Sequence, residues 1–149
     1  MQEAIEYIIQ FLLYGNEQGA QQVGYTADES LWPNYRVVVV PNGQMGKQIV
    51  LPTEADLELR IEKQGNTHIV RTDVIYNTFF YISRAEELLV GERDEHGRFL
   101  AKHSMLGQKN RLMIPLIDEY SRAMMKMLDI ALPEPGFSHI YLTHDIDTI

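Results

Sequence analysis

The stretch Tyr35-Arg-Val-Val-Val-Val-Pro41 decides the fold of this chain. Four consecutive valines are typical of a β-strand that is covered on both faces, because a strand with one exposed face would alternate with polar residues. Pro41 then ends the strand. The sequence therefore predicts a central buried strand over residues 35–41, with shorter strands before it at residues 20–26 and after it at residues 48–52.

A hairpin follows these strands. Residues 57–62, Leu-Glu-Leu-Arg-Ile-Glu, alternate apolar and polar side chains, a turn at residues 64–66, Gln-Gly-Asn, comes next, and residues 67–71, Thr-His-Ile-Val-Arg, resume a strand. This pattern predicts two antiparallel strands with one face on a core. The expected fold class is α/β, with α+β as the alternative, and the expected architecture is a mixed sheet of about five strands flanked by helices.

Helical spacing of apolar residues predicts three main helices, over residues 2–14, 73–89 and 115–130. Gly15 is expected to end the first helix, Thr72 or Asp73 to cap the second, and Pro115 to lie in the first turn of the third. Arg84, Glu86 and Glu87 are expected to face solvent. The expected buried positions are Ile5, Ile8, Ile9, Leu12 and Leu13 in the first helix, Val74, Ile75, Phe79, Ile82, Leu88 and Leu89 in the second, and Leu116, Ile117, Tyr120, Met124, Met127 and Leu128 in the third.

The composition is that of a globular domain able to bury a core, with 45% hydrophobic and 23% charged residues in a length of 149. Its 13 basic and 21 acidic residues give a net charge of −8, which opposes binding to a nucleic acid or an anionic membrane surface. No stretch approaches the roughly 20 apolar residues of a membrane span. Because the chain has no cysteine and its N-terminus lacks the features of a secretory signal, we expect a cytoplasmic protein.

The segment Ser83-Arg84-Ala85-Glu86-Glu87 is the first group of candidate contact residues. One interpretation is a helix surface on which Arg84 pairs with Glu87 or Glu86. The other is a polar cluster in which Arg84 and Glu87 dock a loop or a further domain. The sequence leaves both interpretations open.

The second group lies in residues 91–99, Gly-Glu-Arg-Asp-Glu-His-Gly-Arg-Phe, which predict an exposed loop. Its part from Asp94 onward is interpreted either as a turn with Gly97 at positive φ or as a place where His96 and Arg98 contact a sugar or another domain. Both interpretations remain open at this point.

Pro133-Glu-Pro-Gly136 predicts a domain boundary, because the segment is stiff and turn-prone and is followed at once by an apolar strand pattern, Ser138 to Thr143. The expected organisation is an accessory α/β domain over residues 1–132, a linker over 133–137 and a strand segment over 138–149.

The closing residues Leu142-Thr-His-Asp-Ile-Asp147 resemble the first motif of the polysaccharide deacetylase (NodB-homology) superfamily. In an extended strand Asp145 and Asp147 lie on the same side. Enzymes of this superfamily have a distorted β/α barrel with this motif at the end of its first strand, and they remove acyl groups from sugars with a divalent metal, commonly zinc. The resemblance implies that Asp145 is the general base and Asp147 a metal ligand.

The same superfamily completes its metal site with two histidines four positions apart, and these 149 residues contain no such pair. His139 and His144 are five positions apart, His96 and His103 are seven apart, and His68 stands alone in the hairpin. One carboxylate does not make a zinc site. This chain alone is therefore expected to hold no cofactor and to be inactive.

A second resemblance covers residues 70–147. The blocks Phe79–Glu87, Glu92–Phe99 and Pro115–Tyr120 are similar to an uncharacterised bacterial module found directly before a deacetylase-like barrel. This implies a non-catalytic N-terminal domain of a carbohydrate-active hydrolase, with the barrel in cis and a glycan substrate as its partners. The alternative is a free-standing interaction module whose strand at 138–143 pairs with another chain or with a second copy.

Overall fold

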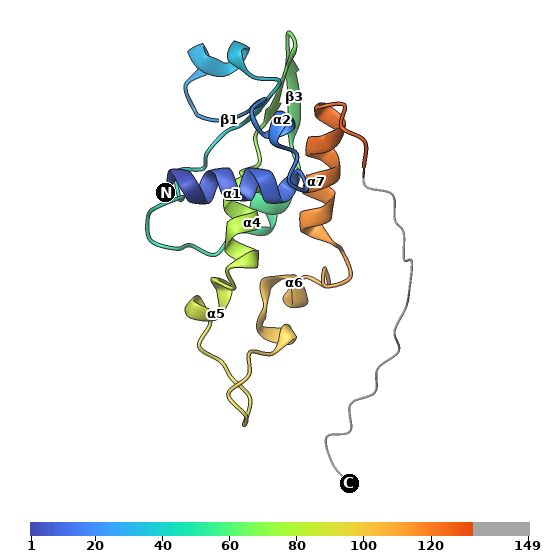
Figure 1. Cartoon of the computed structure of the whole chain (residues 1–149). Coiled ribbons are helices and arrows are strands. Elements are labelled where there is room, and N and C mark those ends of the chain that lie inside the picture. The colour runs from blue at the N-terminus through green and yellow to red at the C-terminus, as the bar shows by residue number, and fades with distance from the viewer. Residues whose placement is uncertain (133–149) are drawn as a thin grey trace.

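The computed structural model describes residues 1–132 of the 149. A four-stranded mixed sheet of order β1-β2-β4-β3 lies at one end of the structure (Figure 1), and in it β1, β2 and β4 run parallel and β3 is antiparallel to β4. The strands are β1 (Val23–Tyr25), β2 (Val37–Val39), β3 (Ile61–Gln64) and β4 (Thr67–Val70). The mixed α/β architecture predicted from the sequence is confirmed.

The valine run forms the middle of the sheet as predicted. Val37, Val38 and Val39 are each completely buried, between β1 on one side and β4 on the other. Val37 and Val39 belong to the main core beneath the helices, whereas Val38 packs with Trp32 and Ile69 on the opposite face. Both faces of β2 are therefore covered, which explains why its sequence shows no polar alternation.

Three helices close the main core. The first, α1 (Gln2–Leu12), contacts α4 (Val74–Ile82) and α7 (Leu116–Met127), and the five positions expected to be buried in α1 and just after it are buried. Gly15 follows α1 with a φ of 76°, as a helix-terminating glycine should. The shorter helices are α2 (Glu17–Ala20), η1 (Glu29–Asn34), α3 (Glu54–Leu57), α5 (Glu86–Leu89), η2 (Ala101–His103) and α6 (Met105–Gln108). None of the helices within residues 1–132 is long and apolar enough to cross a membrane.

The prediction of a strand at residues 48–52 was wrong. Within the part of the chain that the structure describes this segment is irregular, and the hydroxyl of Tyr76 takes the place of a neighbouring strand. It accepts the backbone N–H of Val50 at 2.9 Å and donates to the carbonyl of the same residue at 2.7 Å. Both polar backbone groups of Val50 are thus satisfied without a sheet.

The first strand of the hairpin begins later than expected, at Ile61 rather than at residue 57. Thr53 and Asp56 form a capping box that starts the short helix α3, and this turn buries Leu57 without any strand. All four residues of β3 are exposed, so the prediction that this strand packs one face on the core was also wrong.

The second long helix is shorter than predicted. It ends at Ile82, Arg84 adopts a φ of 57°, and the chain restarts as α5. As a result, the buried side of α5 differs from the one predicted. Leu88 is 78% exposed, whereas Glu86, which was expected to face solvent, is only 7% exposed. Ile82 and Leu89, also expected to be buried, are exposed.

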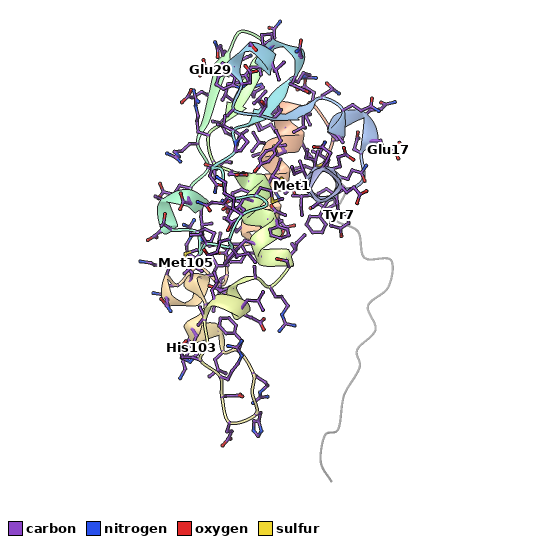
Figure 2. The ribbon with its side chains drawn as sticks, turned by 90° about the vertical axis from the view of Figure 1, so that its left-hand side faces the viewer. Met1, Tyr7, Glu17, Glu29, His103 and Met105 are labelled. Carbon is purple, nitrogen blue, oxygen red and sulfur yellow. The ribbon has the colours of Figure 1, made fainter. Side chains whose placement is uncertain are left out.

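Residues 83–113 form a lobe that projects from the helical layer at the end opposite the sheet (Figure 1). It contains α5, η2 and α6, and residues 91–99 between them have neither helix nor strand, as the sequence predicted. His103 and Met105 mark the lobe in Figure 2, far from Glu29 at the sheet end. The candidate contact residues of the sequence thus lie in one projection.

Candidate functional site

Arg84 and Glu87 form a two-pronged ion pair at the base of the projecting lobe. The Nε and Nη2 atoms of Arg84 donate to the two carboxylate oxygens of Glu87 at 2.6 and 2.8 Å. This contact raises the pKa of Arg84. The predicted pairing of Arg84 with Glu87 is present, and an exposed pair of this kind contributes little to stability. A contact of these two side chains with a further domain stays a prediction.

The loop after α5 is folded around Asp94. Its carboxylate accepts the backbone N–H groups of His96 at 2.9 Å and Arg98 at 2.8 Å, together with Nε of Arg98 at 2.8 Å, while Gly97 has a φ of 74°. These hydrogen bonds, first that from the backbone of Arg98, lower the pKa of Asp94. The turn interpretation is confirmed. The imidazole of His96 lies exposed on this turn, 3.4 Å from Glu95.

Arg93 connects the loop to α5. Its guanidinium donates to the backbone carbonyl of Glu87 at 2.6 Å and lies over the ring of Phe99, 5.5 Å from the centroid. The structure therefore brings Glu87 and the loop together through Arg93. His96 and Arg98 remain on the turn, where Arg98 is committed to Asp94, so these two side chains do not join Arg84 and Glu87 in one site.

The acidic pair at the chain's end, Asp145 and Asp147, lies outside the described residues, as do the predicted linker at 133–137 and the strand at 138–149. Among residues 1–132 no three His, Asp or Glu side chains are grouped so that they could hold a metal ion. The described part of the chain therefore offers no metal centre of its own.

Asp73 is the centre of a buried cluster that the sequence indicated only as a helix cap. One carboxylate oxygen caps α4 by accepting the N–H of Tyr76 at 2.9 Å, and the other accepts the hydroxyl of Tyr25 at 2.8 Å and the N–H of Asn42 at 2.9 Å. These groups come from the carboxyl ends of three parallel strands, where open α/β sheets gather polar residues. Burial raises the pKa of Asp73 against the opposing effect of its hydrogen bonds, and burial also raises the pKa of Tyr25.

A second buried cluster joins α4 to α7. The hydroxyl of Tyr120 donates to the carbonyl of Leu57 at 2.8 Å and accepts from Nδ2 of Asn77 at 3.2 Å, and Asn77 also donates to the carbonyl of Asp56 at 2.7 Å. Burial raises the pKa of Tyr120 to about 12. Within the described residues, three buried side-chain atoms of α4 have no hydrogen-bond partner, namely Oδ1 of Asn77, Oγ1 of Thr78 and the hydroxyl of Tyr81. The polar residues within the α4 sequence did not indicate this hydrogen-bond network.

A cleft of about 730 Å³ lies between α1, α2, η1 and the outer edge of β1. Side-chain amides and carboxylates line it, including Gln10, Gln21, Glu6 and Glu17, and no lysine or arginine of the described residues does so. An anionic ligand would meet only like charge there.

Neither the curated proteins nor the solved structures include a match to this sequence. A family model does match, described as a family of unknown function (DUF7033), over residues 2–133. The match covers the helices, the sheet and the projecting lobe that the structure describes. The chain therefore belongs to the DUF7033 family.

Proposed function

We propose that this chain is the non-catalytic N-terminal domain of a metal-dependent polysaccharide deacetylase-like protein. One observation carries the proposal: the family match ends at residue 133, where the sequence independently predicts the linker at 133–137. The deacetylase-like motif Leu142–Asp147 then lies beyond the family domain, as the first strand of a following barrel would. In this arrangement residues 1–132 are the accessory domain and residues 138–149 begin the catalytic one.

In the parent protein the reaction is hydrolysis of an acyl group, N- or O-linked, from a glycan. Asp145 takes the proton from the attacking water, and Asp147 would hold the divalent metal. When bound, a zinc ion would supply polarisation of the acyl carbonyl and acidification of the water. The accessory domain contributes no catalytic group, and its role is to pack against the barrel and shape its surface.

The first test is the size of the endogenous polypeptide, measured by immunoblotting with an antibody against residues 1–132. A band larger by about 200 to 250 residues, the size of a barrel, is expected. A band near 17.2 kDa, the mass of this chain, would contradict the proposal and favour the free-standing interaction module.

The second test is acetate release from an N-acetylated oligosaccharide by the longer protein, with and without zinc. Asp145→Asn and Asp147→Asn should each abolish a zinc-dependent activity, whereas Glu29→Gln, an exposed change at the sheet end of the accessory domain, should leave it unchanged. Equal activity of the 149-residue chain alone would show that the barrel is dispensable and would rule the proposal out.

A further inference from the structure

The outer side of α1 is aromatic although its inner side already supplies the core. Tyr7 and Phe11 lie one helical turn apart on this outer side, and Tyr14 follows just after the helix ends, with a φ of 51°. All three side chains are exposed, and Figure 2 shows Tyr7 turned away from the sheet. The rings of Tyr7 and Phe11 stack with their centroids 6.4 Å apart. An aromatic stripe on the solvent side of a helix is not required by folding of the described residues.

This stripe forms one wall of a continuous groove. Three adjoining hollows of about 390, 420 and 240 Å³ follow one another along it. The first two share Phe11 and Ile82, and the second and third share Tyr14 and Gly15. We call this surface the aromatic groove and define it by Tyr7, Phe11, Tyr14, Ile82, Ile117 and Ala131.

The aromatic groove is nearly free of charge. Within residues 1–132 its lining includes one charged side chain, Asp118, and this carboxylate accepts the hydroxyl of Tyr14 at 3.3 Å. The whole chain, in contrast, is 23% charged. A contiguous apolar surface on such a protein marks a contact with another apolar surface rather than with a charged ligand.

The chain itself indicates what covers the groove. Ala131 lines its third hollow, so the polypeptide leaves the described part of the molecule at one end of the groove. A proline-rich linker over residues 133–137 can span only about 16 Å, at about 3.1 Å per residue. A domain that begins at Ser138 is thereby held beside the groove at an effective concentration of about 1 mM, where even weak apolar contacts are occupied.

We infer that the aromatic groove is the surface on which the domain following the linker docks in cis through an apolar face. This inference rests on the proposed function and extends it, because it names the face of the accessory domain that meets the barrel. Docking on both α1 and α4 would also fix the angle of the barrel relative to the projecting lobe.

The test is thiol labelling, followed at the introduced cysteine by peptide mass spectrometry, and residues 1–149 contain no other cysteine. Phe11→Cys places a thiol in the groove, and Leu31→Cys places one in η1, outside it. The two side chains are matched, being 44% and 42% exposed. Each variant is made in the longer protein and in the 149-residue chain, and the rate of alkylation is compared after circular dichroism has verified the fold.

Docking with a dissociation constant of about 0.1 mM should slow alkylation at position 11 about tenfold in the longer protein relative to the 149-residue chain, since at an effective concentration of about 1 mM the groove is then occupied for about nine-tenths of the time. Alkylation at position 31 should be equal in both. Equal rates at position 11 would overturn the inference while leaving the deacetylase assay unaffected. Protection that grows with the concentration of the 149-residue chain would assign the groove to a second copy, and a native chain that ends at Ile149 would overturn the inference and the proposed function together.

Discussion

The hydroxyl of Tyr25 donates a hydrogen bond of 2.8 Å to Asp73 and so joins the end of β1 to the start of α4, 48 residues later in the chain. The same carboxylate holds the loop after β2 through Asn42. One buried carboxylate therefore joins three segments of the chain, and its removal should affect all of them.

Asp73→Ala should destabilise the domain by about 2–4 kcal/mol, because it removes a helix cap and leaves the hydroxyl of Tyr25 and the N–H of Asn42 without their acceptor. Tyr25→Phe removes one of the three contacts and should cost about 1 kcal/mol. Urea unfolding followed by circular dichroism measures both values. A loss below about 0.5 kcal/mol for Asp73→Ala would mean that the cluster does not hold the three segments.

Tyr120→Phe should cost about 1–3 kcal/mol, since the carbonyl of Leu57 and the amide of Asn77 would each lose a buried partner. The matched control is Tyr14→Phe, which removes a hydroxyl from an exposed tyrosine and should change stability by less than about 0.5 kcal/mol. Similar values for the two variants would contradict a buried network.

Glu86 should determine the order of the projecting lobe rather than the stability of the whole domain. Its carboxylate accepts the backbone N–H of Met105 at 2.6 Å and so anchors α6 to α5. Glu86→Ala should speed hydrogen exchange of the Met105 amide by about tenfold or more, with a smaller effect on the sheet. Glu87→Ala, which removes only an exposed ion pair, should leave that amide unchanged.

The capping box of α3 should give a pH-dependent contribution. Hydrogen bonds from Thr53 lower the pKa of Asp56 from its ordinary value of 3.8. A carboxylate with a lowered folded-state pKa stabilises the fold above its unfolded pKa, and this contribution is lost as the pH falls through the folded value. Asp56→Asn should therefore be less stable than the parent at about pH 7, and the difference in stability should shrink as the pH falls below 3.8. A stability difference that does not change between these conditions would contradict this assignment.

The sheet could be predicted where one pattern had one explanation. Four valines in a row suit only a strand covered on both faces, and β2 is such a strand. The segment at residues 48–52 also contains a run of apolar residues, but the hydroxyl of Tyr76, which is distant in sequence, forms hydrogen bonds with the backbone N–H and carbonyl of Val50. That competition depends on tertiary structure, and a local pattern cannot reveal it.

The prediction of which side of α5 is buried was wrong for a related reason. Helical periodicity assigned Leu88 to the core and Glu86 to solvent, whereas the break at Arg84 rotated the face and the N–H of Met105 stabilised the buried carboxylate. The turn at Asp94 to Arg98 was predictable because its hydrogen bonds are all local. Asp73 was indicated as a cap, but its contacts to Tyr25 and Asn42 join residues that are far apart in the sequence.

The packing of α1 against α7 has a consequence for how the protein is made. The partners of α1 in the core include residues from 116 onward, so α1 cannot be fully covered during synthesis until about one hundred residues more have been added. At 5–20 residues per second this interval lasts roughly 5 to 20 seconds. During this interval both apolar sides of α1 are exposed to solvent. Newly made chains of this family should therefore bind chaperones that recognise nascent polypeptides.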